Sequence, residues 1–143
     1  MPKTLILDLD GTLVDSVPDL AAALNRLMAA RGLAAFGHAE TARMVGDGAR
    51  ALVDRAFAAR AGRADAAAQR DFLADYTAHA AVASRPFPGA EACLLALRAA
   101  GWVLTVCTNK PEAPARALLA ALDLAKYFPV IELDCLKAKE LTA

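Results

Sequence analysis

A short apolar stretch that ends in two closely spaced acids constrains the fold of this chain more than any other feature. From residue 5 to residue 16 the sequence reads LILDLDGTLVDS. The apolar run predicts a buried strand over residues 5–9, and the polar and glycine residues that follow predict its end. Open parallel α/β sheets bind ligands outside the carboxyl ends of their strands, which is where Asp8 and Asp10 would lie. The stretch therefore predicts an α/β protein with a site at this edge of its sheet.

The two acids can act on one bound group. Asp8 and Asp10 are two residues apart, so in an extended backbone both side chains can point toward one spot. Two carboxylates so close repel each other, and a bound cation relieves the repulsion. Gly11 lets the backbone turn sharply and leaves room for a bound group. The alternative is an ordinary strand that ends in an Asp-Gly turn with solvated acids.

The segment that follows carries a helical pattern. Apolar residues at helical spacing predict helices over residues 17–31, 39–45, 49–61 and 64–83. Ser16 is the expected N-cap of the first helix, Pro18 suits its first turn, and Gly32 stands just past its end. We find no convincing strand between Asp15 and Ser84, so residues 15–84 are expected to form a helical cap inserted into the α/β unit.

The chain then returns to alternating helices and strands. Two prolines and a glycine in the sequence RPFPG, residues 85–89, cannot continue a helix and mark the boundary. The pattern predicts helices over 90–100 and 112–122, and strands over 102–107 and 128–133. Strand, helix, strand at this spacing implies a parallel sheet with right-handed crossovers. Residues 1–14 and 85–143 are therefore expected to form the core.

A second polar cluster follows the strand predicted over residues 102–107. Thr108, Asn109 and Lys110 offer a hydroxyl, a backbone amide and an ammonium, which are groups that bind phosphate oxygens. The alternative is a helix N-cap and turn. Because parallel strands deliver their carboxyl ends to one edge of the sheet, this cluster is expected beside Asp8 and Asp10.

These segments together resemble a known family. The stretch from Asp8 onward resembles the first motif of the haloacid dehalogenase-like phosphohydrolases, Asp-x-Asp-Gly-Thr, with the common continuation Leu-Val-Asp-Ser. The sequence TNKP from Thr108, preceded by FPG and a leucine-rich helix, is similar to phosphoglycolate phosphatases in particular. The sequence VGDGA from Val45 also resembles the cap loop of that subfamily. The resemblance extends to about residue 130 and implies a Rossmann-like parallel-sheet core with an inserted helical cap.

The resemblance also implies a magnesium-dependent phosphomonoester hydrolase. Asp8 would be the nucleophile that forms an aspartyl-phosphate, and Asp10 would be the general acid and then the general base. Mg²⁺ would be held by Asp8 and the backbone carbonyl of Asp10. The residues that would bind phosphate are Gly11, Thr12, Thr108, Asn109, Lys110 and Lys139. The loop that would cover the substrate consists of Gly46, Asp47 and Gly48, for which a helix C-cap followed by an N-cap is the alternative interpretation.

The chain departs from the family pattern near its end. Lys137 and Lys139 are both candidates for the third-motif lysine, and Lys139 is preferred by its distance from Asp134, although Glu140 stands where proline is expected. The fourth motif, Gly-Asp with a further acid, is absent before Ala143. The sequence thus looks like a C-terminally truncated phosphatase. A sugar-phosphate mutase of the same superfamily, or an impaired fragment that only binds phosphate, are the alternatives.

Composition and charge bear on the partners. Sixteen Lys and Arg balance sixteen Asp and Glu, so nothing suggests a footprint for nucleic acid or for an acidic membrane. No apolar run approaches the ~20 residues that span a bilayer, and the acids within the first apolar run do not suit a secretory signal. A cytoplasmic enzyme with a small phosphomonoester substrate is expected. If the family's remaining strands are missing, the first strand lies at an edge, and the chain is expected to form a homodimer or to aggregate through it, or to be marginally stable.

Overall fold

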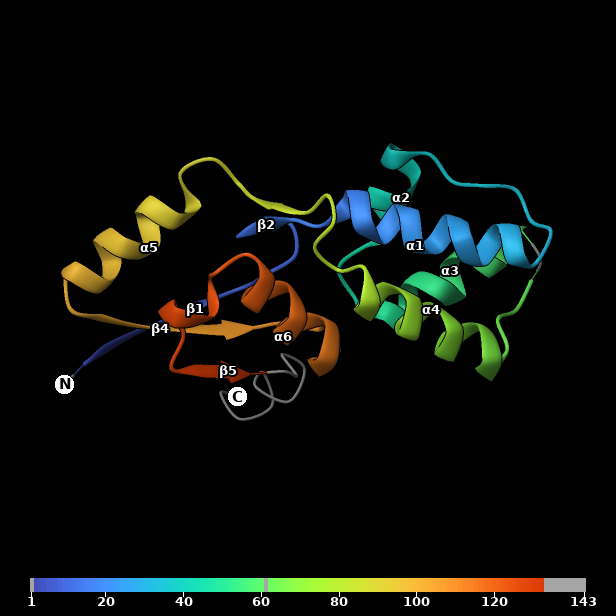
Figure 1. Ribbon diagram of the computed structural model, residues 1–143. Coiled ribbons are helices and arrows are strands. Elements are labelled where there is room, and N and C mark those ends of the chain that lie inside the picture. Colours follow the sequence, from blue (N-terminus) through green and yellow to red (C-terminus); the bar gives the residue numbers. More distant parts are fainter. Residues whose placement is uncertain (1, 61, 133–143) are drawn as a thin grey trace.

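The computed structural model describes residues 2–60 and 62–132 of the chain. Figure 1 shows two units side by side, a group of helices and an α/β unit that contains a sheet. We call helices α1–α4 the cap, and the sheet with helices α5 and α6 the core. The chain leaves the core after its first strand, builds the cap and then returns to the core (Figure 1).

Three parallel strands form the core sheet. They are β1 (Lys3–Leu7), β4 (Trp102–Cys107) and β5 (Val130–Glu132), in the spatial order β1-β4-β5. Leu5 pairs with Leu104, and Thr105 pairs with Val130. Helix α5 (Ala90–Ala99) leads into β4, and helix α6 (Glu112–Ala121) with the 3₁₀ turn η1 (Ala125–Tyr127) leads from β4 to β5. The predicted α/β class with a parallel sheet is confirmed.

The two faces of the sheet differ in exposure. Leu104 and Val106 are buried in the hydrophobic core, against which Leu5, Leu7 and Ile131 also pack. The pairing puts Ile6, Val103 and Val130 on the opposite face, where they are 63%, 37% and 51% exposed. Within the described residues, β1 pairs with a strand on one side only. In the described part of the chain, three apolar side chains on one face of the sheet and one edge of the sheet are therefore exposed.

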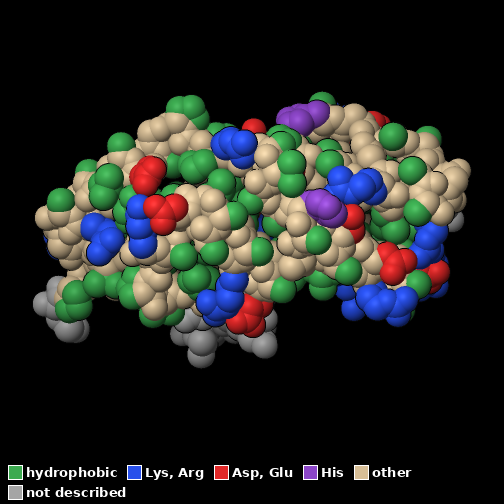
Figure 2. All heavy atoms as spheres, viewed as in Figure 1, with side chains coloured by type: hydrophobic (Ala, Val, Ile, Leu, Met, Phe, Trp, Pro, Cys, Tyr) green, Lys and Arg blue, Asp and Glu red, His purple; other side chains and the backbone are tan. Residues whose placement is uncertain are grey.

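Four helices build the cap: α1 (Val17–Ala30), α2 (His38–Met44), α3 (Ala49–Arg60) and α4 (Ala66–Ala78). The apolar positions of the α1 pattern are buried as predicted: Leu20, Leu24, Leu27 and Met28. On α4, Phe72 and Tyr76 are buried one turn apart with their rings stacked 5.8 Å between centroids. No described helix is long and apolar enough to cross a membrane. Basic and acidic side chains are interspersed over the face of the molecule in Figure 2.

The joint between cap and core differs from the expectation. Two short strands, β2 (Val14–Asp15) and β3 (Arg85–Pro86), form an antiparallel ribbon where the chain leaves and re-enters the core. Helix α4 ends at Ala78, whereas the sequence predicts a helix that reaches residue 83. The Asp19 carboxylate, 3% exposed, accepts hydrogen bonds from the backbone N–H groups of Ala83 and Ser84 and from the Ser84 hydroxyl. These bonds hold together the two chain segments that connect the cap to the core.

Two further boundaries were predicted imprecisely. The first strand ends at Leu7, so Asp8 and Asp10 lie just beyond it and not within it. The third strand begins at Val130 and not at residue 128, since Phe128 and Pro129 connect η1 to it. The acids therefore sit in the loop at the carboxyl end of the sheet, which is the location where this fold class binds ligands.

Candidate active site

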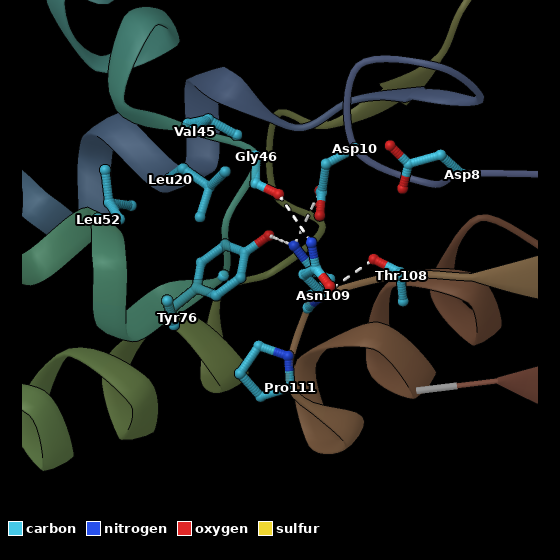
Figure 3. Close-up of a pocket in the computed structure, with 13 residues that line it drawn as sticks. Asp8, Asp10, Leu20, Val45, Gly46, Leu52, Tyr76, Thr108, Asn109 and Pro111 are labelled. Atoms are coloured by element: carbon cyan, nitrogen blue, oxygen red, sulfur yellow. Dashed lines mark hydrogen bonds and ion pairs between the residues drawn. The ribbon is translucent and has the colours of Figure 1, made fainter. Parts of the chain in front are cut away.

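A small cavity of about 30 Å³ lies where the cap meets the carboxyl end of the sheet (Figure 3). The core contributes a polar wall that consists of Asp8, Asp10, Thr108, Asn109, Lys110 and Pro111. The cap contributes a largely apolar wall that consists of Leu20, Val45, Gly46, Gly48, Ala49, Leu52 and Tyr76. The cavity is thus polar where the two sequence motifs meet and apolar where the cap covers them.

The two acids have different surroundings. Asp8 is exposed, and its Oδ1 accepts a hydrogen bond from the backbone N–H of Leu9 at 2.7 Å. The Asp10 side chain is 14% exposed, and its Oδ1 accepts from the Ser16 hydroxyl at 2.5 Å and from the Lys110 ammonium at 3.0 Å. Asp8 is therefore accessible from the cavity, while one oxygen of Asp10 is held by two donors.

The second motif lies beside these acids, as predicted. Thr108 follows β4 directly and is 1% exposed, and its Oγ1 accepts the backbone N–H of Lys110 at 3.1 Å. That bond leaves the Thr108 hydroxyl proton available for an acceptor in the cavity. Lys110 is 4% exposed, and besides Asp10 its ammonium donates to the Tyr76 hydroxyl at 2.5 Å. The ammonium also lies 4.4 Å from the centroid of the Tyr76 ring, within range of a cation–π interaction.

Burial dominates the electrostatics of this cluster. Desolvation lowers the pKa of Lys110, and the negative charge of Asp10 opposes that shift. Desolvation raises the pKa of Tyr76 well above its usual value, and the charges of Asp10 and Asp19 add to the effect. Tyr76 is therefore a neutral hydroxyl that can accept from Lys110. The ammonium of Lys110 depends on Asp10 for its compensating charge.

The cap loop contacts the second motif directly. The Asn109 side-chain amide donates to the backbone carbonyl of Gly46 at 3.2 Å. Gly48 has a φ of +90°, and a Cβ at this position would lie 2.8 Å from the backbone oxygen of Asn109. Only glycine allows so close an approach in this conformation. The loop is thus fitted against the core at the cavity.

Not every predicted site residue reaches the cavity. Asp8, Asp10, Thr108, Asn109, Lys110, Gly46 and Gly48 line it. Gly11 and Thr12 do not, and their backbone N–H groups donate to the backbone carbonyls of Val14 and Leu9 within the turn. Asp47 does not line it either, and its carboxylate forms an ion pair with Arg55. Lys137 and Lys139 lie outside the described residues.

Two polar residues of the site were assigned other roles from sequence. Ser16 stands at the N-cap position of α1 but makes no side-chain cap bond, because its hydroxyl donates to Asp10. Tyr76 fits the apolar stripe of its helix, and nothing in its position predicts a bond to Lys110, 34 residues away. The proximity of Ser16 to the first motif is a weak signal, whereas the Tyr76 contact has no local signal.

The donor atoms present suit Mg²⁺. Among the described residues no group of three or more His, Cys, Asp or Glu side chains could hold a metal ion. Mg²⁺ does not need one, because it commonly binds one or two carboxylates and completes its octahedron with waters and substrate phosphate oxygens. The exposed Asp8 carboxylate, at a cavity that also has phosphate-binding groups, fits that mode.

A parallel α/β core whose first strand leads into Asp-x-Asp, with a helical insertion over the site, is the arrangement expected of haloacid dehalogenase-like hydrolases. The model of that family matches residues 2–138, and the chain belongs to the family. It resembles phosphoglycolate phosphatases within it. The chain is 53% identical over 133 residues to the phosphoglycolate phosphatase of Rhodospirillum rubrum. The aligned region covers 87% of this chain and 55% of that protein.

Two further relatives agree. Identity to a phosphoglycolate phosphatase of Cereibacter sphaeroides is 41% over 131 residues, or 89% of this chain and 60% of that protein. A crystal structure of a predicted phosphoglycolate phosphatase from Haemophilus somnus superimposes with a TM-score of 0.79 at 28% identity, covering 92% of this chain and 62% of that one. The chain thus spans 55–60% of the length of these two curated relatives.

Proposed function

We propose that the chain carries the active site of a magnesium-dependent phosphomonoester hydrolase, acting on a small substrate such as 2-phosphoglycolate through an aspartyl-phosphate. The observation that supports this most is the meeting of Asp8 and Asp10 with Thr108, Asn109 and Lys110 at one cavity. Two carboxylates beside phosphate-binding groups provide a nucleophile, an acid and an anchor for the phosphoryl group.

The reaction starts at the accessible carboxylate. An Asp8 oxygen attacks phosphorus, and the bond between phosphorus and the ester oxygen breaks. Asp10 gives its proton to the departing alkoxide, and it later takes a proton from the water that hydrolyses the aspartyl-phosphate. Because Ser16 and Lys110 hold Oδ1 of Asp10, Oδ2 is the oxygen that carries this proton. Mg²⁺, bound by Asp8 and the backbone carbonyl of Asp10, would offset the charge between carboxylate and phosphate.

Thr108 and Asn109 hold the phosphoryl group. The Thr108 hydroxyl, fixed by the Lys110 backbone N–H, donates to one phosphate oxygen, and the Asn109 backbone N–H donates to another. Two N–H bonds of the Lys110 ammonium are used by Asp10 and Tyr76, which leaves the third to face the phosphate. These groups stabilise the charge that shifts to the equatorial oxygens in the transition state.

The names of the curated relatives favour a small substrate, since both are called phosphoglycolate phosphatase. This supports the phosphatase over the sugar-phosphate mutase that the sequence left open. The cavity itself measures about 30 Å³ with the cap loop against Asn109, which is room for roughly two water molecules, so either substrate needs the cap to move before it can bind.

The test is release of inorganic phosphate from 2-phosphoglycolate, with glucose 6-phosphate as the comparison, in the presence of Mg²⁺ and after its removal by EDTA. We expect turnover of ~1 s⁻¹ or more on 2-phosphoglycolate, and a loss of at least ~10³-fold in Asp8→Asn. Asp54→Asn is the matched control, because Asp54 is an exposed acid on α3 that does not line the cavity. Full activity of Asp8→Asn would contradict the mechanism.

A phosphate-binding fragment without turnover is the second candidate, because the chain spans little more than half of its curated relatives. Calorimetric titration with inorganic phosphate and Mg²⁺ separates the two. Binding without phosphate release from any ester would favour the fragment, whereas turnover at an ordinary enzymatic rate would exclude it.

A further inference from the structure

We infer that Tyr76 is a positioning residue for Asp10: its hydroxyl holds the Lys110 ammonium against the Asp10 carboxylate, and thereby links the acid to the cap. The inference rests on the proposed role of Asp10 as the general acid. It adds a residue of the cap to a site whose motifs all lie in the core or in the cap loop. It also gives Lys110 a role beyond phosphate binding.

Hydrogen bonds connect three side chains in a row, from Asp10 through Lys110 to Tyr76. Lys110 Nζ lies 3.0 Å from Asp10 Oδ1 and 2.5 Å from the Tyr76 hydroxyl. The Lys110 side chain is 3% exposed and Tyr76 is 1% exposed, so water does not compete for either bond. In Figure 3 the Tyr76 hydroxyl points from the cap toward the loop that carries Asp10. No direct bond joins Tyr76 to Asp10 among the described contacts.

The Lys110 ammonium is held in place because, in its buried position, it has few other hydrogen-bond acceptors. A buried ammonium is costly unless it is paired and hydrogen-bonded, and burial accordingly lowers the pKa of Lys110. Asp10 supplies the opposite charge whenever it is ionised and accepts the ammonium on Oδ1 in either state, and Tyr76 supplies a hydroxyl acceptor and the face of its ring, 4.4 Å away. Without the hydroxyl, one N–H of the ammonium would be buried without that acceptor. The ammonium would then shift, and Asp10 with it.

The arrangement depends on where the cap lies. Tyr76 is on α4, whereas Asp10, Ser16 and Lys110 are on loops at the core. Phe72 stacks on Tyr76 and fixes its ring within the cap. If the cap moves away from the core, the hydroxyl leaves Lys110. Asp10 is therefore fully positioned only while the cap covers the cavity, when water is excluded from the reaction.

Tyr76→Phe removes the hydroxyl and keeps the ring, which makes it the informative variant. A displaced general acid slows esters with alkoxide leaving groups, which need protonation, far more than esters with nitrophenolate, which does not. We expect kcat on 2-phosphoglycolate to fall ~10–100-fold with KM within ~2-fold, and kcat on p-nitrophenyl phosphate to fall less than ~3-fold. Phe57→Leu, which disturbs the packing of the cap at a buried residue outside the cavity, should slow both substrates equally. An equal loss on both substrates in Tyr76→Phe would overturn the inference.

A second measurement needs no turnover, so it decides the inference even if the proposed function fails. Urea unfolding is measured for Tyr76→Phe, Asp10→Asn and the double variant, alone and with Lys110→Met. Because Tyr76 acts on Asp10 only through Lys110, we expect a coupling of ~3-fold or more in the unfolding equilibrium constant that disappears with Lys110→Met. Additive effects of Tyr76→Phe and Asp10→Asn would overturn the positioning role.

Discussion

Thr108 is the residue whose proposed role can be tested with the smallest change of shape. Thr108→Val removes the hydroxyl and keeps the branched side chain at a position that is 1% exposed. A hydrogen bond to a charged group contributes about 1.5–3 kcal/mol, so we expect phosphate to bind ~10–100-fold more weakly in the presence of Mg²⁺. Calorimetric titration measures the affinity. Thr4→Val on the exposed face of β1 is the control, and equal binding by both variants would exclude Thr108 as a phosphate ligand.

Gly48 allows a test of the contact between the cap loop and the core. Gly48→Ala puts a Cβ 2.8 Å from the Asn109 backbone oxygen, in a conformation with φ of +90° that alanine rarely adopts. The matched control is Gly32→Ala, which has a φ of +66° and nothing within 4 Å of the added Cβ. Both variants share a strain of ~1–2 kcal/mol. We expect a larger loss of unfolding free energy and a higher KM in Gly48→Ala alone, and equal losses would argue against the close contact.

Residues of the site could be predicted from sequence where they belong to contiguous motifs. Asp8 and Thr108 follow strands directly and Asp10 lies two residues beyond Asp8, so the rule that parallel strands end at one edge brings them together. Tyr76 could not be predicted, because its partner is 34 residues away and its spacing fits ordinary core packing. Local rules predict Ser16 as the N-cap of helix α1. The Asp10 carboxylate in the preceding turn accepts the Ser16 hydroxyl instead.

At the scale of elements, hydrogen bonds to Asp19 stabilise the joint between cap and core. Asp19→Ala would leave the backbone N–H groups of Ala83 and Ser84 and the Ser84 hydroxyl without their acceptor in a buried place. Each unsatisfied buried group costs about 1–3 kcal/mol, so we expect the free energy of unfolding to fall by ~3 kcal/mol or more. Thermal or urea unfolding measures this.

The control for that prediction is Asp54→Ala, which removes an exposed acid paired with Arg50 on α3. Exposed pairs contribute about 0–1 kcal/mol, so this variant should unfold almost like the parent chain. Similar losses in Asp19→Ala and Asp54→Ala would mean that the Asp19 contacts do not hold the joint.

The elements themselves were largely predictable, whereas the joint was not. The strand over 102–107 and the helices from residues 17 and 49 begin where their apolar periodicity begins. The ribbon of β2 and β3 has two residues in each strand, which is too short for any periodicity to appear. Helix α4 ends at Ala78, and Asp19, far away in the sequence, binds the backbone of Ala83 and Ser84, so local patterns extend the helix too far.

For the whole molecule, we predict that the 143-residue chain associates with itself through the open side of its sheet. Strand β1 is unpaired on one side within the described residues, and its free backbone groups can pair with another chain. Ile6, Val103 and Val130 add exposed apolar side chains beside that edge.

The variant Ile6→Lys tests this prediction. A charge on an edge strand opposes such pairing, so Ile6→Lys should shift the chain toward a monomer in light scattering over a dilution series. The control is Leu95→Lys on α5, an equally large change at a residue that is 54% exposed but lies outside the sheet. We expect it to leave the association unchanged. A parent chain that stays monomeric at micromolar concentration would show that this face and edge do not drive assembly.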